Sequence, residues 1–159
     1  MWQRPGRLPP ARPPSLQSQV QQVCVNNQAI IRRFESGAVP AGSFHHADHV
    51  RLAFAYLCEY PIFEAGQKFC VALKRFADAH GKTDLYNETI TCAYLFLIHE
   101  RMARDQSVNW DDFARRNPEL LVWRNGILNR YYEESTLKSD LARRVFVLPD
   151  KGLHSRRSG

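Results

Sequence analysis

Residues 86–104, YNETITCAYLFLIHERMAR, form the most apolar stretch of the chain and predict a long helix. Five side chains within it recur at helical spacing and are expected to share one face: Glu88, Cys92, Leu95, His99 and Met102. Thr83 precedes the stretch and is expected to cap the helix. A helix with an apolar face needs partners that cover this face, so the stretch indicates a helical bundle.

Three further helices are predicted upstream of this stretch. Apolar residues in helical phase predict one helix over residues 15–36, a second that Pro61 ends, and a third over residues 62–80. Ser43 is expected to cap the second helix by accepting a hydrogen bond from a free backbone N–H. Gly81 is expected to end the third helix, because glycine readily adopts the backbone conformation that closes a helix.

The C-terminal third of the chain is predicted to hold shorter elements. Residues 109–116 are followed by a break at residues 117–118 and a segment to residue 130, and residues 135–144 indicate a short helix. Residues 146–149, FVLP, indicate an extended strip that packs across the bundle. No strand pattern recurs. The predicted fold is therefore all-α, a single-domain bundle of four main helices with short C-terminal helices and an extended C-terminal strip.

The positive charge of the chain lies at its two ends. The net charge is +6, and the ends hold six basic residues and no acidic one: Arg4, Arg7, Arg12, Lys151, Arg156 and Arg157. The body between them is neutral overall, which argues against a nucleic-acid-binding domain. We predict a disordered Pro/Arg-rich arm over residues 1–14, a helical domain over residues 15–150 and a basic disordered tail over residues 151–159.

The sequence also indicates the compartment in which the protein is expected and the state of its cysteines. No segment is long and apolar enough for a secretory signal or a membrane span, so a cytoplasmic protein is expected. The four cysteines are widely spaced and fall mostly on apolar helix faces: Cys24, Cys58, Cys70 and Cys92. This distribution favours reduced, buried thiols over a disulfide framework. No Cys-x-x-Cys pair occurs, and a zinc site built from cysteines is not expected.

Three histidines open the second predicted helix, in the run FHHADH at residues 44–49. When the apolar face of that helix is extended backwards at about 3.6 residues per turn, His46 falls on the face and His49 at its border. His45 falls further towards solvent. His80 ends the inner face of the third predicted helix.

His46, His49 and Glu88 are interpreted as three metal ligands that leave coordination positions open. Two neutral imidazoles and one carboxylate suit catalytic zinc or non-haem iron(II), and His80 is a candidate fourth ligand. Two alternatives remain open. One is a polar pocket that binds a ligand without metal. The other is a structural role, in which the histidines bond to Asp48, Ser43 or a backbone carbonyl at the start of their helix and Glu88 stabilises a positive helix N-terminus.

The candidate catalytic residues are Glu88, Tyr86 and Asp48. Glu88 or Asp48 is expected to transfer a proton, while Asp48 also has the chemistry to orient a histidine ring. Tyr86 is expected to donate a hydrogen bond to a bound oxyanion or carbonyl. A plain structural role for Asp48, as a partner of the helix dipole, is the alternative.

Between about residues 28 and 150, four runs resemble a family of small uncharacterised bacterial all-helical proteins: residues 44–51, 80–82, 85–91 and 142–150. The resemblance rests on a Phe-His-His-x-x-His run and a Tyr-x-Glu-Thr-x-Thr run. It implies importance for His46, His49, Glu88 and Thr89, and it implies no particular reaction. The family often has histidine where this chain has Asn87, so a ligand or donor at that place is missing here.

The sequence thus predicts a small helical enzyme with a His/His/Glu polar site, with or without zinc or iron(II), whose substrate is unknown. The alternative is a non-catalytic helical module that binds a small molecule or docks a partner protein. A small-molecule ligand is expected, whereas nucleic acid and membrane are not.

Overall fold

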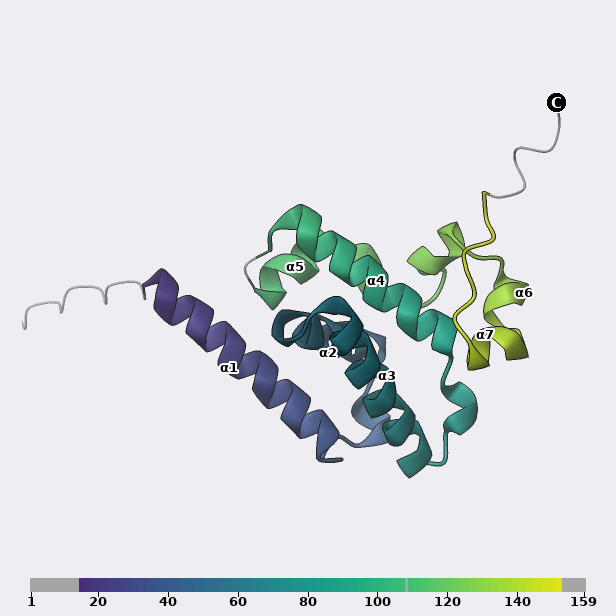
Figure 1. Cartoon of the computed structure of the whole chain (residues 1–159), viewed down its shortest axis with the longest axis horizontal. Helices are drawn as coiled ribbons and strands as arrows, with labels where there is room; N and C mark the ends of the chain where they lie inside the picture. The colour runs from purple at the N-terminus through teal and green to yellow at the C-terminus, as the bar shows by residue number, and fades with distance from the viewer. Residues whose placement is uncertain (1–14, 108, 153–159) are drawn as a thin grey trace, which may run out of the picture.

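The computed structural model describes residues 15–107 and 109–152. These residues form seven α-helices and four 3₁₀ turns, and no β-strand lies among them. In Figure 1 the four long helices form the body of the molecule, the short helices α6 and α7 lie beside one end of α4, and the short helix α5 lies near the other end. The prediction of an all-α fold is confirmed.

The first helix, α1 (Leu16–Glu35), packs against the helix that follows it. Ser15 caps it, because the Ser15 side chain accepts a backbone N–H of the first turn. Ile31 and Phe34 are its buried apolar residues near the C-terminal end. Gly37 ends the turn after it with a φ of 75°, a conformation that glycine adopts without steric cost.

The second helix, α2 (His46–Glu59), is the central helix of the body and packs against α1 and the two long helices that follow. Six consecutive or nearly consecutive residues of α2 are buried: Val50, Leu52, Ala53, Phe54, Ala55 and Tyr56. A helix buried on more than one side must be apolar around most of its circumference, and α2 meets that requirement.

The predicted cap of α2 is wrong. Ser43 lies in a 3₁₀ turn, Ala41–Ser43, and its hydroxyl donates to the Pro40 carbonyl at 2.9 Å. The N-cap residue is His45, whose backbone N–H donates to the Asp48 carboxylate at 2.8 Å. The extra turn moves the start of the helix beyond Ser43, and the carboxylate satisfies the free N–H in place of a serine.

Two long helices follow, α3 (Ile62–Ala79) and α4 (Glu88–Asp105). Asn87 caps α4, because its side-chain oxygen accepts the Ile90 N–H at 2.9 Å. Thr83, the predicted cap, instead begins a 3₁₀ turn. The turn lengthens the connection, and Glu88 becomes the first residue of α4.

The buried face of α4 differs from the predicted one. The buried residues are Thr89, Ala93, Tyr94, Leu95 and Ile98. Of the five side chains expected on one face, Leu95 is buried whereas His99 is exposed. The reason is that α4 packs against α2, α3 and a short C-terminal helix, so no single narrow stripe describes its contacts.

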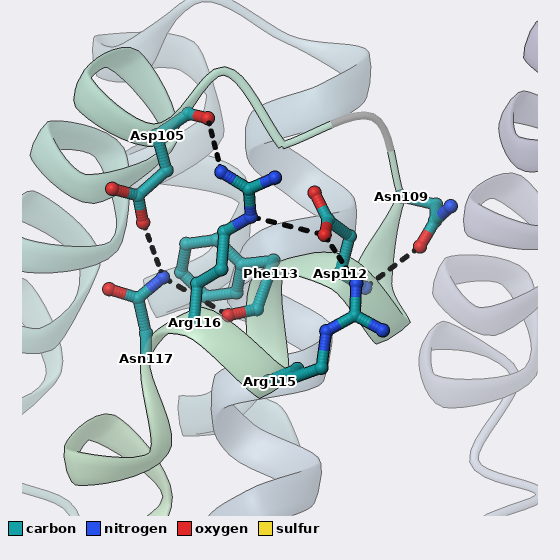
Figure 2. A network of polar contacts seen from close by, with 7 residues as sticks. All are labelled: Asp105, Asn109, Asp112, Phe113, Arg115, Arg116 and Asn117. Atoms are coloured by element: carbon teal, nitrogen blue, oxygen red, sulfur yellow. Dashed lines mark hydrogen bonds and ion pairs between the residues drawn. The ribbon is translucent and has the colours of Figure 1, made fainter.

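The next helix, α5 (Trp110–Arg116), is tied to the end of α4 by the polar network that Figure 2 shows. The Asp112 carboxylate accepts hydrogen bonds from two arginine side chains of its own helix. The bond from Arg116 is the largest cause that lowers the pKa of Asp112. The buried Asn117 amide donates to the Asp105 carboxylate at 2.7 Å, which fixes the corner between α4 and α5.

The C-terminal segment consists of two 3₁₀ turns, Pro118–Leu121 and Ile127–Arg130, and two short helices, α6 (Glu134–Leu137) and α7 (Asp140–Arg144). The helix α7 packs against α4. Buried side chains from this segment, Leu120 among them, join the core formed by the long helices. The segment therefore belongs to the same folded unit.

The extended strip after α7 is fixed to α4 by Thr89, which is fully buried. The Thr89 hydroxyl donates to the Val145 carbonyl at 2.8 Å, and it accepts the Val147 N–H at 3.0 Å. The Tyr132 hydroxyl donates to the Val147 carbonyl at 2.9 Å. The predicted strip across the bundle is therefore present.

The described part of the fold extends past the predicted domain end at residue 150. The Lys151 N–H donates to the Tyr131 carbonyl at 3.0 Å, and its side chain donates to the Asn129 carbonyl at 2.8 Å. The first residue of the predicted tail is thus docked. The predicted arm over residues 1–14, and the tail from residue 153 onwards, lie outside the described residues. Within the described ranges, no helix has the length and apolar character needed to cross a membrane.

Candidate functional site

A pocket with a volume of about 450 Å³ is lined by α2, α3 and α4. Its walls are mainly apolar and include Phe44, Val50, Phe69, Leu73, Phe76 and Ile90. Polar side chains also line it, among them His46, His49, His80, Tyr86, Asn87 and Tyr94. The pocket therefore collects three of the four predicted metal ligands, together with Tyr86.

His46, the first residue of α2, is held by the C-terminal segment. Its Nε2 lies 2.8 Å from the Leu120 carbonyl oxygen, and a carbonyl only accepts, so Nε2 carries the hydrogen. Burial is the largest cause that lowers the pKa of His46, and the bond to Leu120 offsets part of this effect. The ring is neutral near neutral pH, and its Nδ1 is an acceptor.

His49 lies about one turn further along α2, and its ring packs on Phe44 with 4.2 Å between the ring centroids. Burial lowers the pKa of His49 to about 4, with a smaller contribution from His46 and a partial offset by Asp48. No hydrogen bond from the described residues reaches its ring nitrogens. A neutral imidazole with both nitrogens available therefore borders the pocket.

Two further polar groups border the pocket. The His80 Nδ1 is bonded to the Phe76 carbonyl at 2.8 Å, which leaves its Nε2 for a ligand. Tyr94 is 7% exposed, and its ring stands edge-on to His46 at 4.8 Å. Burial raises the pKa of Tyr94 to about 12, so its hydroxyl remains protonated. Sequence reasoning assigned no role to Tyr94, because an aromatic residue in an apolar helix usually indicates core.

Glu88 is not among the residues that line the pocket. Its carboxylate accepts the Tyr86 hydroxyl at 2.9 Å and forms an ion pair with Lys74 at 2.8 Å. The start of α4 therefore directs Glu88 towards α3, while the ring of Tyr86 forms part of the pocket wall. Burial is the largest cause that raises the pKa of Tyr86, and the tyrosine stays protonated.

Asp48 is also absent from the pocket lining. Its exposed carboxylate accepts the His45 N–H at the start of α2, which is the structural role considered as the alternative for this residue. It acts on His49 only at a distance, through its charge. His45 itself is exposed, as predicted.

Two cysteines from different helices meet beside Glu88. The sulfur atoms of Cys70 and Cys92 lie 4.0 Å apart, and the Cys92 sulfur lies 3.9 Å from a Glu88 oxygen. The hydrogen bond with Cys92 lowers the pKa of Cys70 to about 7, and burial partly opposes it, while the pKa of Cys92 is raised by the same hydrogen bond and by burial. Cys58 is exposed, so the expectation of buried thiols is wrong for that residue.

Cys70, Glu88 and Cys92 bring their ligand atoms within 4.8 Å of one another, and they are the one such group of histidine, cysteine and acidic residues in the described chain. The predicted ligands His46, His49, His80 and Glu88 do not meet this condition. The reason is that His46 is bonded to the Leu120 carbonyl whereas Glu88 is bonded to Lys74, so different partners hold the two side chains.

Sequence reasoning missed the group formed by Cys70, Glu88 and Cys92. A weak signal was available, because Cys70 and Lys74 are four residues apart on one helix, as are Glu88 and Cys92 on the other. The pairing of the two faces depends on how α3 and α4 pack, and spacing within the sequence does not supply that information.

Comparisons with protein-family models, with curated proteins and with solved structures found no match.

Proposed function

We propose that this protein binds a small, mostly apolar molecule that carries a hydrogen-bond donor, in the pocket lined by α2, α3 and α4. The observation that carries the proposal is His49, a neutral imidazole at the pocket whose nitrogens have no hydrogen-bond partner in the described chain. A ligand that fills the apolar pocket displaces water from this ring, and burying the ring without a partner is costly, so the ligand must itself supply the hydrogen bond.

The size and lining of the pocket support this proposal. Its volume of about 450 Å³ lies within the range of roughly 300–1,000 Å³ that is usual for small-molecule sites. Apolar walls supply most of the binding free energy, because they release water when a ligand covers them. The few polar groups then orient the ligand.

The polar groups define the chemistry of the ligand. The neutral rings of His46 and His49 offer acceptor nitrogens, and the Tyr94 hydroxyl is protonated. An alcohol, a phenol or an N–H group satisfies such acceptors by donating a hydrogen bond. The proposed ligand is therefore a mostly apolar molecule with a hydroxyl or N–H group.

Binding without catalysis agrees better with this site than metal-dependent catalysis does. A general base works best when its pKa lies near the working pH, and the pKa of His49 is about 4. A metal site built from His46, His49 and Glu88 would require Glu88 to leave Lys74. The enzyme hypothesis remains a second proposal and needs such a rearrangement.

The direct test uses β-naphthol and its methyl ether as probes, with binding measured by isothermal titration calorimetry. The two molecules have the same apolar rings, but only β-naphthol donates a hydrogen bond. We expect β-naphthol to bind roughly three- to tenfold more tightly, which corresponds to one ordinary hydrogen bond. If neither probe binds, or if both bind equally, the proposal is wrong.

Two matched variant pairs locate the binding. Ala77 lines the pocket whereas Ala79 is exposed on the same helix, so Ala77→Phe should abolish binding and Ala79→Phe should leave it unchanged. His49→Phe keeps a ring against Phe44 but removes the acceptor nitrogen, and it should erase the difference between the two probes. The same change at the exposed His45 should preserve the difference.

A further inference from the structure

We propose that Cys70, Glu88 and Cys92 form a zinc-binding site between α3 and α4. This site is separate from the proposed ligand pocket, because none of the three residues lines that pocket. The argument rests on the distances between the donor atoms, on the charges around them and on the contacts that hold Glu88.

The spacing of the donor atoms matches the edges of a zinc tetrahedron. Zinc–sulfur bonds of about 2.3 Å at a tetrahedral angle place two sulfur atoms about 3.8 Å apart, and a sulfur and an oxygen about 3.6 Å apart. The two sulfur atoms lie 4.0 Å apart, and the Cys92 sulfur lies 3.9 Å from the Glu88 Oε1. The third edge, from the Cys70 sulfur to a Glu88 oxygen, is no longer than 4.8 Å, so an inward shift of these side chains would bring all three donor atoms to bonding distance of one zinc ion.

The charges around the site also balance. Two thiolates and a carboxylate carry three negative charges, zinc supplies two positive charges, and the adjacent Lys74 ammonium supplies the third. Each thiol releases its proton to water when the metal binds. A bound zinc ion therefore leaves this half-buried cluster neutral.

The contacts of Glu88 leave one oxygen available for a metal. Its Oε2 accepts the Tyr86 hydroxyl at 2.9 Å and the Lys74 ammonium at 2.8 Å. Its Oε1 faces Cys92. Such outer partners hold a ligating carboxylate in place, so Lys74 and Tyr86 are positioning residues for the metal.

The exposed fractions of the side chains indicate how an ion can enter the site. Cys70 is 8% exposed, whereas the side chains of Glu88 and Lys74 are 20% and 50% exposed. An ion can therefore enter from the side of the carboxylate. Three protein ligands leave the fourth coordination position of the zinc open to a water molecule.

The test is a cobalt(II) titration of the untagged full chain after metal removal, with the thiols kept reduced. We expect one equivalent of cobalt to produce a thiolate-to-cobalt charge-transfer band and the intense visible bands of tetrahedral cobalt. Added zinc should bleach both. A titration that shows only the weak spectrum of hexaaqua cobalt would overturn the proposal, and this outcome needs no variant.

Variants then assign the ligands. Cys70→Ser and Cys92→Ser should remove the charge-transfer intensity of their sulfur and weaken zinc binding by more than about 100-fold, while Cys58→Ser should change neither. Lys74→Met should weaken zinc binding by about tenfold or more without changing the spectrum. If Cys92→Ser binds zinc as the parent does while His49→Phe does not, the metal belongs to the histidines and the proposal fails.

Discussion

The protonation state of His49 follows from the apolar groups around it. Water stabilises an imidazolium ion far better than Phe44 and its neighbours do, and the positive charge is therefore disfavoured at this place. The sequence predicted that His46 and His49 lie on the inner side of α2, because helical phase fixes the direction of a side chain. It did not predict their partners, since the Leu120 carbonyl that binds His46 lies 74 residues away.

This burial gives the stability of the protein a specific dependence on pH. In the unfolded chain His49 has a pKa near 6.5, and in the folded protein it has a pKa of about 4. As the pH falls, the unfolded chain takes up the proton first. The contribution of His49 to stability is therefore complete above about pH 6.5 and is lost as the pH falls towards 4, by up to about 3 kcal/mol.

Urea unfolding between about pH 7 and pH 4 measures this effect. The parent should lose more stability across this interval than His49→Phe does, because the variant has no imidazole to protonate at this position. Carboxylates titrate in both proteins, so their contribution cancels when the two losses of stability are compared. Equal losses in the two proteins would show that His49 is not buried in its neutral form.

At the scale of elements, the sequence predicted where helices lie more accurately than how they begin. Apolar periodicity extends over many residues, and so α1 and α3 were located to within a residue or two at each end. A cap depends on which single side chain reaches a free N–H after a turn. Asn87 has this role at α4, and the Asp48 carboxylate accepts the His45 N–H at α2, because 3₁₀ turns displace Ser43 and Thr83.

The contact between α3 and α4 is close, and Leu95 is central to it. Leu95 is 2% exposed, and a Cβ at Gly66 of α3 would lie 3.0 Å from its side chain. We expect Leu95→Ala to lower the free energy of unfolding by about 2–5 kcal/mol, through lost burial and a residual cavity. Leu148→Ala, at a residue that is 72% exposed, should cost less than about 0.5 kcal/mol. Similar unfolding midpoints in urea for the two variants would contradict this assignment.

The attachment of the C-terminal strip to α4 depends on Thr89. The Thr89→Val change removes a donor to the Val145 carbonyl and an acceptor for the Val147 N–H. We expect a loss of about 1–3 kcal/mol and faster hydrogen exchange of the Val147 amide. Thr83→Val, at an exposed threonine, is the control and should leave exchange in the strip unchanged. Unchanged protection in Thr89→Val would mean that other contacts hold the strip.

At the scale of the whole molecule, the proposed pocket and the proposed metal site lie on either side of one residue. The ring of Tyr86 lines the pocket, and its hydroxyl donates to Glu88. The sequence placed Tyr86 and Glu88 in one site with the histidines, and the structure instead makes Tyr86 the link between two groups of residues. The packing of α2, α3 and α4 determines on which side of Tyr86 the histidines lie and on which side Glu88 lies.

This position predicts that the two sites are coupled. Metal binding at Glu88 should fix Tyr86, and a ligand that contacts the Tyr86 ring should bind with a different affinity once the metal is present. Binding free energies are reciprocal, so cobalt should change the Kd of β-naphthol by the same factor by which β-naphthol changes the Kd of cobalt. We expect a factor of about five or more, measured by calorimetry with each probe in the presence and absence of the other.

The Tyr86→Phe variant tests the route of this coupling. It keeps the ring in the pocket wall and removes only the hydroxyl that reaches Glu88, so both probes should still bind while the coupling factor falls towards one. Tyr94→Phe is the matched control, because Tyr94 lines the same pocket and its ring lies beside His46 instead. A coupling factor that survives Tyr86→Phe but disappears in Tyr94→Phe would place the link between the sites elsewhere in the bundle.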